Sequence, residues 1–410
     1  MSRSVPFHRI LQILLLPAAL FLLSGDVSHQ PPRAVALPPL EQTSEGGGFV
    51  PGELLVKPAR GASGLSAELA MKYPVALKEE LAPLGVLRLG VPEGRELEII
   101  GLLRSDPRVE WAELNHVRTL MAVPDDRLYR QFQWNLRQMQ MEKAWEISTG
   151  SQEVLVAVLD TGIDRSHPDL EGKLLPGRDM LNDDSNPEDD SGHGTHKAGV
   201  VGALSNNGTG VAGISWGARI LPVKVLNSSG VGPDSVIARG ITYAADEGAR
   251  VINMSFGSST SSQLLADAVR YATQKGSLLV AAAGNTARVD NAVIYPAAYP
   301  QVLAVAATDE NDEVADFSQH HSYVGISAPG VHIVSTFWRD AGYGSYVSSS
   351  GTSDAAPHVS GLAALIWSVN PGLSPAQVKK IIQDTADDLG TPGNDEYYGT
   401  GRINAYKALL

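Results

Sequence analysis

Residues 351–361 read Gly-Thr-Ser-Asp-Ala-Ala-Pro-His-Val-Ser-Gly, a glycine turn that leads directly into an apolar stretch. The run at 355–366 predicts a buried helix, with Pro357 in its first turn, where the missing N–H costs nothing. Ser353 would then lie at a helix N-terminus, where unpaired N–H groups and a partial positive charge stabilise negative charge on a substrate oxygen. This position suits a nucleophile.

A serine hydroxyl is a weak nucleophile until a base accepts its proton and a third group orients the base. Taken alone, Gly-Thr-Ser is a common capped turn, so the assignment of Ser353 as a nucleophile depends on whether the chain also supplies a base and an acid. Residues 156–162 read Val-Ala-Val-Leu-Asp-Thr-Gly, and residues 191–199 read Ser-Gly-His-Gly-Thr-His-Lys-Ala-Gly. They place Asp160 and His193 upstream of Ser353, so the chain offers an acid, a base and a nucleophile.

The chain order Asp, His, Ser is that of subtilisin. On these motifs, residues 125–410 closely resemble a secreted subtilisin-like serine protease, in the branch that includes thermitase. The resemblance implies an endopeptidase in which Ser353 attacks the scissile carbonyl, His193 transfers the proton and Asp160 orients the imidazole. It also implies that Asn285 donates a side-chain hydrogen bond to the oxyanion.

The same resemblance implies how a substrate would bind. Residues 253–257, Asn-Met-Ser-Phe-Gly, are similar to the strand edge to which an extended peptide adds as a β-strand. Ile294 stands where the family often has a small or polar residue, so we expect a short pocket that favours small or medium apolar side chains. The predicted substrate-binding residues are Ser255, Phe256, Gly257, Ala282, Ala283, Gly284 and Ile294.

Two residues depart from the family pattern. Lys197 stands where a small or apolar residue is usual, and Asp354 stands where methionine usually follows the nucleophile. Either charge buried alone would be costly, whereas a buried pair is tolerable. We therefore expect Lys197 and Asp354 to form an ion pair; two independent, solvated changes are the alternative.

Calcium is the predicted cofactor, in a structural role. One candidate site has five oxygen-bearing side chains within ten residues, in a loop that matches a calcium-binding loop of thermitase-like enzymes; a solvated acidic loop is the alternative. These residues are Asp179, Asn182, Asp184, Asn186 and Glu188. A second candidate site combines side-chain oxygens with main-chain carbonyls, a ligand set that suits Ca²⁺ better than Mg²⁺. Its residues are Asp126, Asp169, Leu204, Asn207, Thr209 and Val211.

Composition limits the other possibilities. The chain has 410 residues, 43% of them hydrophobic, and no cysteine, which excludes disulfides, thiolate catalysis and thiolate metal sites. Of the net charge of −13, almost all follows residue 123: 12 Lys and Arg against 13 Asp and Glu precede residue 124, and 20 against 32 follow it. Such an acidic protein has no electrostatic reason to bind nucleic acid or an anionic membrane.

Four segments are expected along the chain. Basic residues and a short apolar run predict a secretory signal at 1–25, too short to span a bilayer, and a Pro/Ser/Gly-rich linker follows at 26–48. Residues 49–123 predict a small α+β unit that resembles the family's inhibitory propeptide, with an unrelated ferredoxin-like module as the alternative. The peptidase domain is expected at 124–410. We thus expect a secreted, monomeric zymogen that is inhibited by its own propeptide and cleaves itself close to residues 121–124.

The fold class follows from the alternation of elements after residue 150. Short apolar strands alternate with helical patterns, which predicts a mostly parallel sheet with helices on both faces. In such sheets, functional residues gather beyond the carboxyl ends of the strands.

Two other classes of function compete with this interpretation. A catalytically silent binding protein would retain the fold but not the chemistry, and labelling of Ser353 by an organophosphonate would discriminate. An α/β-hydrolase lipase or esterase is disfavoured, because no Gly-x-Ser-x-Gly segment occurs and the order of the triad would be Ser, Asp, His.

Overall fold

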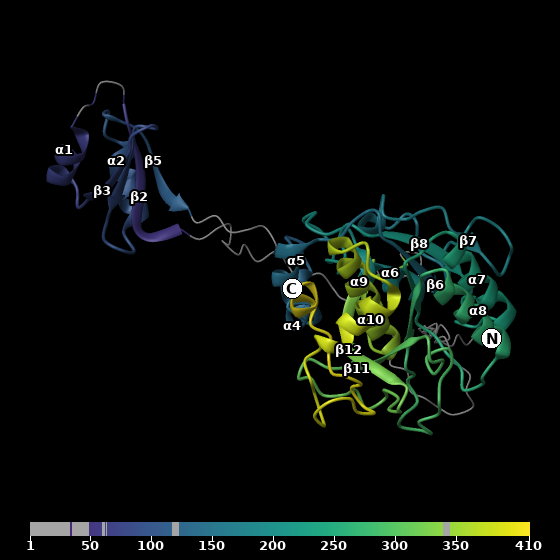
Figure 1. The fold of residues 1–410 in the computed structure, drawn as a ribbon. Coiled ribbons are helices and arrows are strands. Elements are labelled where there is room, and N and C mark those ends of the chain that lie inside the picture. The colour runs from purple at the N-terminus through teal and green to yellow at the C-terminus, as the bar shows by residue number, and fades with distance from the viewer. Residues whose placement is uncertain (1–32, 35–48, 60–61, 63, 117–122, 339–344) are drawn as a thin grey trace, which may run out of the picture. The chain divides into compact units, whose positions relative to one another are not determined.

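The computed structural model describes residues 33–34, 49–59, 62, 64–116, 123–338 and 345–410 (Figure 1). The predicted signal segment, most of the linker and the first half of the expected cleavage segment, residues 121–122, lie outside these residues. The chain forms two compact units, one within residues 38–121 and the other containing residues 122–410. No helix in the described part of the chain is long and apolar enough to span a membrane.

The smaller unit is an α+β sandwich. Its antiparallel sheet has the strand order β3-β4-β2-β5, and side chains such as Leu54, Leu89 and Leu103 form its core. Its elements are β2 (Phe49–Pro58), α1 (Leu65–Lys72), β3 (Ala76–Leu81), β4 (Val86–Gly90), α2 (Glu96–Arg104) and β5 (Val109–His116). Two helices and one antiparallel sheet are what the sequence predicts for this segment.

The larger unit is built on a seven-stranded sheet with the order β12-β11-β10-β9-β6-β8-β7, in which every neighbouring pair is parallel. Its strands are β6 (Leu155–Asp160), β7 (Arg178–Asp179), β8 (Arg219–Lys224), β9 (Val251–Met254), β10 (Leu278–Ala282), β11 (Leu303–Thr308) and β12 (Val324–Pro329). The parallel sheet predicted from the alternation is confirmed.

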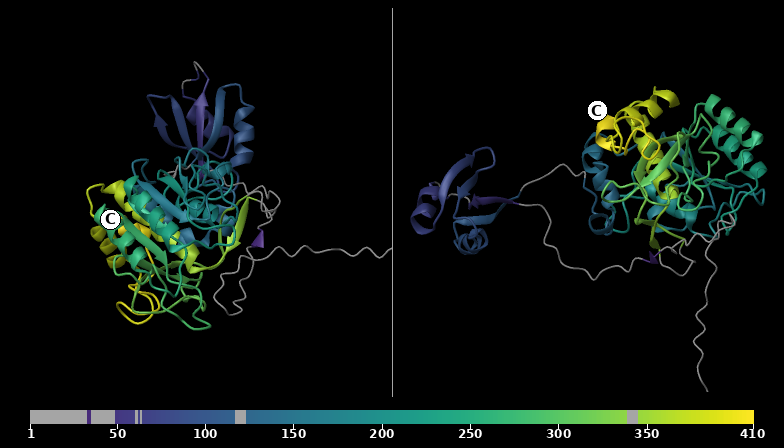
Figure 2. Two further views of the ribbon diagram at one scale, coloured as in Figure 1. Left: turned by 90° about the vertical axis from the view of Figure 1, so that its right-hand side faces the viewer. Right: turned by 90° about the horizontal axis from the view of Figure 1, so that it is seen from below.

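Helices cover both faces of this sheet (Figure 2). Alternate residues of β6 point to opposite faces: Val156 and Val158 pack with the core around α9, whereas Ala157 and Leu159 pack with α7 and α8. The helices are α3 (Tyr129–Phe132), α4 (Trp134–Gln138), α5 (Met141–Ile147), η1 (Pro168–Leu170), α6 (His193–Gly202), α7 (Asp234–Asp246), α8 (Gln263–Gln274), α9 (Thr352–Val369), α10 (Pro375–Asp384) and α11 (Ala405–Leu409).

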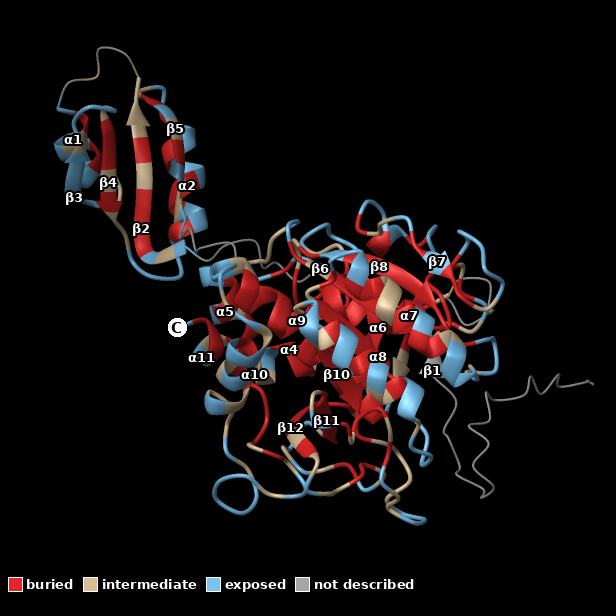
Figure 3. Ribbon diagram, turned by 45° about the vertical axis from the view of Figure 1, so that its right-hand side comes forward, coloured by how far each residue is buried: buried red, intermediate tan, exposed pale blue. Residues whose placement is uncertain are grey.

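Helix α9 runs through the interior and is buried from Thr352 to Trp367 (Figure 3). It begins earlier than predicted, at Thr352, so Pro357 lies in the second turn and not in the first. The apolar run marks where the helix is buried, whereas its start is set by the turn at Gly351. Ser353 is nevertheless in the first turn, as expected.

A second, small antiparallel sheet was not predicted. It has the order β1-β14-β13, formed by β1 (Arg33–Ala34), β14 (Tyr346–Ser349) and β13 (Ile333–Thr336). Two residues of the expected linker thus pair with the strand that leads into the Ser353 helix.

Candidate active site

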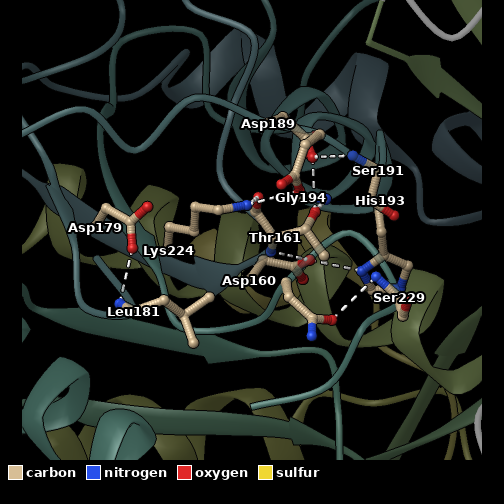
Figure 4. Close-up of polar contacts among 12 residues, drawn as sticks. Asp160, Thr161, Asp179, Leu181, Asp189, Ser191, His193, Gly194, Lys224 and Ser229 are labelled. Atoms are coloured by element: carbon tan, nitrogen blue, oxygen red, sulfur yellow. Dashed lines mark hydrogen bonds and ion pairs between the residues drawn. The ribbon is translucent and has the colours of Figure 1, made fainter. Parts of the chain in front are cut away.

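Asp160 and His193 lie side by side at the carboxyl end of β6. His193 Nδ1 is 2.7 Å from Asp160 Oδ1, with the carboxylate fully buried and the imidazole 24% exposed (Figure 4). Asp160 Oδ1 also accepts a hydrogen bond from Thr161 N at 2.7 Å. With its Nδ1–H donated to the carboxylate, the ring offers Nε2 as a base.

A buried network holds the start of α6, which carries His193. Thr161 Oγ1 accepts from Gly194 N at 3.0 Å and donates to Asp189 Oδ1 at 2.8 Å (Figure 4). Asp189 in turn accepts from Gly192 N and from Thr195 N, at 2.9 and 3.0 Å. Burial raises the pKa of Asp189 above its usual value. Neither Thr161 nor Asp189 is among the site residues predicted from the sequence, although the Asp-Thr-Gly motif contains the threonine.

Ser353 lies in the first turn of α9, next to a glycine that leaves room for its neighbours. A Cβ added to Gly351 would lie 2.9 Å from Ser353 Oγ and 3.2 Å from Asn285 Nδ2. The hydroxyl and the amide nitrogen therefore flank one small volume. A substrate oxygen in that volume would be within reach of both groups.

Asn285 follows β10 and is held by Thr352. Its Oδ1 accepts from both the N–H and the hydroxyl of Thr352, each at 2.8 Å, while Thr352 Oγ1 accepts from Gly284 N at 3.0 Å. Because the amide oxygen is occupied in this way, the Nδ2 hydrogens are left for another acceptor. Thr352 is not among the site residues predicted from the sequence, although it stands beside the predicted nucleophile.

His193 and Ser353 of the predicted triad lie on helices that pack against each other, α6 and α9. Among the hydrogen bonds of the described residues, none joins Ser353 Oγ to His193. Lys197 of α6 does reach α9: its Nζ lies 2.5 Å from Asp354 Oδ1, and both side chains are buried. The predicted Lys197–Asp354 ion pair is confirmed.

Three of the predicted substrate-binding residues come together. A Cβ on Gly257 would lie 2.3 Å from Ile294 Cγ2, and one on Gly284 would lie 2.6 Å from Ile294 Cγ1. Ile294, 4% exposed, thus lies between Gly257 and Gly284, both of which are predicted to bind the substrate.

The other predicted substrate-binding residues face the interior. The Ser255 hydroxyl accepts from Asn253 Nδ2 at 2.9 Å, and Phe256 packs in the core beside α7 and α8. Ala282 and Ala283 are buried at and just after the end of β10. For these four residues, only the main chain is left to pair with a peptide.

The first predicted calcium loop folds back on itself, with Asp179 and Asp184 paired through their main chains. Asp179 already accepts hydrogen bonds from Leu181 N, Asn182 N and Asn182 Nδ2, while Asp184 Oδ1 accepts from Asn186 N. Burial raises the pKa of the Glu188 carboxyl. In the described part of the chain, no three His, Asp or Glu side chains gather as a metal-binding group.

The second predicted calcium site has an unsatisfied buried oxygen. Asp126 Oδ1 is buried without a hydrogen-bond partner, while its Oδ2 accepts from Asn206 N at 2.7 Å. Burial raises the pKa of Asp126 to about 6, and the negative charge of nearby Asp169 adds to this increase. Asn207 Nδ2 and Val211 N donate to the two Asp169 oxygens, at 3.0 and 2.9 Å. Two neighbouring carboxylates and an orphaned oxygen fit a hard cation.

Comparison with known proteins extends this picture. Residues 151–401 match the model of the subtilase family, Peptidase S8. The chain is 39% identical over 370 residues to the thermophilic serine proteinase of Bacillus sp. (strain AK1), covering 89% of each chain. It is 44% identical over 286 residues to thermitase of Thermoactinomyces vulgaris, covering 70% of this chain and 99% of that protein.

A solved structure is also similar. It is described as one of the proteases from Pseudoalteromonas arctica PAMC 21717 and superposes with a TM-score of 0.64 at 34% sequence identity. The match covers 70% of this chain and 98% of that one.

Proposed function

The chain belongs to the subtilase family of serine peptidases, in its thermitase-like branch, and on that premise we propose that it is a secreted, calcium-stabilised endopeptidase made as a zymogen. Asp160, His193 and Ser353 are the proposed triad. The observation that carries this proposal is the 2.7 Å contact between His193 and Asp160, together with the small volume that Ser353 of α9 and Asn285, in the loop after β10, flank from two sides.

The proposed chemistry is acyl transfer. Ser353 Oγ attacks the scissile carbonyl carbon while His193 Nε2 accepts the hydroxyl proton, and His193 then returns that proton to the leaving amine as the C–N bond breaks. Water hydrolyses the resulting ester by the same steps. Buried Asp160 stabilises the imidazolium that forms in between.

The oxyanion of each tetrahedral intermediate would be held by two donors, Asn285 Nδ2 and the Ser353 N–H. Asn285 needs no rearrangement for this, because Thr352 already fixes its amide. Donors that are oriented before the reaction stabilise developing charge at no reorganisation cost. A peptide substrate would bind as an added strand along residues 255–257, with the side chain that precedes the cut entering a pocket shortened by Ile294.

Calcium would be held by Asp126 and Asp169, with the Asn207 side chain and the carbonyls of Leu204, Thr209 and Val211. The other predicted loop, around Asp179 and Asp184, would take a second ion. A bound cation would neutralise the buried carboxylates and stabilise the folded state by mass action.

The segment 49–123 is the proposed propeptide. In this proposal it inhibits the enzyme within the same chain until self-cleavage near residues 121–124. The mature enzyme is then a soluble monomer outside the cell. The full chain is similar to a thermophilic serine proteinase over 370 residues, or 89% of its length. This similarity extends beyond the predicted peptidase domain and therefore supports a precursor of this kind.

The test compares the full-length chain with its Ser353→Ala variant, both incubated with calcium. The wild-type chain should convert to a shorter form whose new N-terminus lies near residues 121–124 and should then hydrolyse peptide substrates. The variant should stay full-length and inactive. A wild-type chain that neither matures nor hydrolyses any peptide would support the silent binding protein instead.

A further inference from the structure

A buried ion pair lies directly behind the proposed nucleophile. Lys197 Nζ lies 2.5 Å from Asp354 Oδ1, and the two side chains are 1% and 0% exposed. Lys197 is one helical turn beyond His193 on α6, and Asp354 follows Ser353 on α9. The pair therefore joins the two helices that carry the base and the nucleophile.

The carboxylate of this pair lies close to where the oxyanion would form. A Cβ on Gly351, which would lie 2.9 Å from Ser353 Oγ, would also lie 3.5 Å from Asp354 Oδ2. That oxygen is buried and has no hydrogen-bond partner. An uncompensated anion so near would repel the negative charge that develops on the substrate oxygen, and burial makes the repulsion stronger than it would be in water.

Two histidines lie close to Asp354, but neither carries the positive charge that would neutralise its carboxylate. His196 Nδ1 lies 3.1 Å from Asp354 Oδ1, yet burial and the Lys197 charge lower the pKa of His196. His358 Nδ1 lies 2.8 Å from the Asp354 carbonyl oxygen, and burial lowers the pKa of His358 to about 4. Both imidazoles are therefore neutral at pH 7, and Lys197 is the cation that balances the carboxylate.

The charged and titratable groups around Asp354 come from several elements. Those of α6 are His193, His196 and Lys197, that of α9 is His358, and Asp160 of β6 contacts His193. Although burial raises the pKa of Asp354, the charge of Lys197 and the contacts with Lys197 and His196 together outweigh burial and hold that pKa below its usual value. The carboxylate is thus ionised at neutral pH.

We propose, on the premise that Ser353 is the nucleophile, that Lys197 is a positioning residue of the active site: it neutralises the Asp354 carboxylate beside the oxyanion volume and fixes the helix of His193 to that of Ser353. The proposal makes the two partners unequal. Removing the lysine leaves an anion beside the oxyanion, whereas removing the carboxylate does not.

The test uses the full-length chain, matured with calcium, with active sites counted by organophosphonate titration so that misfolded protein does not enter kcat. Lys197→Met should lower kcat by about 10- to 100-fold with a much smaller change in KM, the size expected for a poorly screened like charge. Asp354→Asn should change kcat by only a few-fold. The double variant Lys197→Met with Asp354→Met should recover most of the activity.

A pH series separates electrostatics from packing. Without Lys197, burial raises the pKa of Asp354, so that carboxyl is neutral at low pH and becomes an anion as the pH rises. The ratio of kcat for Lys197→Met to kcat for the double variant should therefore fall with rising pH. A packing role alone gives a constant ratio, because both variants carry the same methionine at position 197.

Lys173→Met is the matched control. Lys173 is also a buried lysine, but it donates to the carbonyl of Trp216, away from the triad. Its loss should lower stability and leave the pH dependence of kcat unchanged.

Three results would overturn the proposal: equal losses of kcat in Lys197→Met and Asp354→Asn, a pH-independent ratio, or a double variant as impaired as Lys197→Met. If Lys197→Met yields no mature enzyme, the double variant should still mature and be active, and its failure to do so would also overturn the proposal. A different result would contradict the proposed function itself: a wild-type chain that neither reacts with the organophosphonate nor hydrolyses peptides.

Discussion

Asn285 accepts two hydrogen bonds from Thr352 through one oxygen, from the main-chain N–H and from the hydroxyl, each 2.8 Å long. This arrangement fixes which end of the amide faces the volume beside Ser353. It makes the orientation of the proposed oxyanion donor a property of the resting enzyme, and not of substrate binding.

Replacing Asn285 by alanine should therefore reduce kcat by about 10²- to 10³-fold, or about 3–4 kcal/mol of transition-state stabilisation, the usual cost of losing such a donor in enzymes of this family. KM should change little, because the bond to the oxyanion strengthens only as the transition state forms. Steady-state kinetics on a short peptide substrate measure both quantities.

Asn285→Asp is the informative companion to that experiment. Aspartate keeps an oxygen for Thr352 but has no N–H to donate, so it should be at least as impaired as alanine. Near wild-type activity in either variant would mean that Asn285 is not the oxyanion donor.

Ile294 should limit the size of the side chain accepted before the cut. It fills the space between Gly257 and Gly284, so Ile294→Ala should open that space and raise kcat/KM for substrates with phenylalanine or tyrosine there, relative to alanine, by roughly 10-fold or more. A peptide series that varies this one position measures the change. Val293→Ala, at an exposed neighbour, is the control and should leave the preference unaltered. An unchanged preference in Ile294→Ala would place the pocket elsewhere.

Asp126 should change from stabilising to destabilising when calcium is removed. Its folded pKa, about 6, is above the ordinary value of 3.8, so the metal-free protein should lose stability as the pH rises from about 4 through 6. Asp126→Asn removes that cost but also removes a ligand. In a Ser353→Ala background, which prevents self-digestion, the asparagine variant should have the lower Tm in calcium and an equal or higher Tm in a chelator at pH 7.

The matched control is Asp246→Asn, an exposed carboxylate that pairs with Lys275 and lies outside both predicted calcium loops. Its Tm should respond to calcium as the parent protein does. If Asp126→Asn had the lower Tm with and without calcium alike, a cation site at Asp126 would be excluded.

The sequence predicted the parallel sheet and placed Asp160 and Asn285 at or just after the ends of strands. Both features could be predicted because short apolar runs and the motifs that follow them can be recognised from residues that are close together in the sequence. The ion pair could also be predicted, since Lys197 and Asp354 each depart from the family pattern in a way that is costly alone. Its proposed role beside the oxyanion could not be predicted, because that role depends on how the fold gathers Ser353, Asn285 and Asp354 around Gly351.

Other features depend on long-range hydrogen bonding that has no local signature. Asp189 supports three main-chain N–H groups at the start of α6, yet in the sequence it is one acidic residue among several. The spacing of oxygen-bearing residues likewise predicts five calcium ligands at 179–188. It cannot show that Asp179 accepts hydrogen bonds from the main-chain N–H groups of its own turn. Pro357 was placed one turn too early because hydrophobicity marks burial and not the first residue of a helix.

The proposed mechanism requires that Ser353 is a nucleophile activated by His193. Mass spectrometry of the calcium-matured chain after treatment with an organophosphonate tests this directly. We expect one adduct, on the peptide that contains Ser353, and at least a 10³-fold slower reaction in His193→Ala, since the hydroxyl is a weak nucleophile without its base. An adduct on another residue, or labelling of Ser353 at the same rate without His193, would contradict the account.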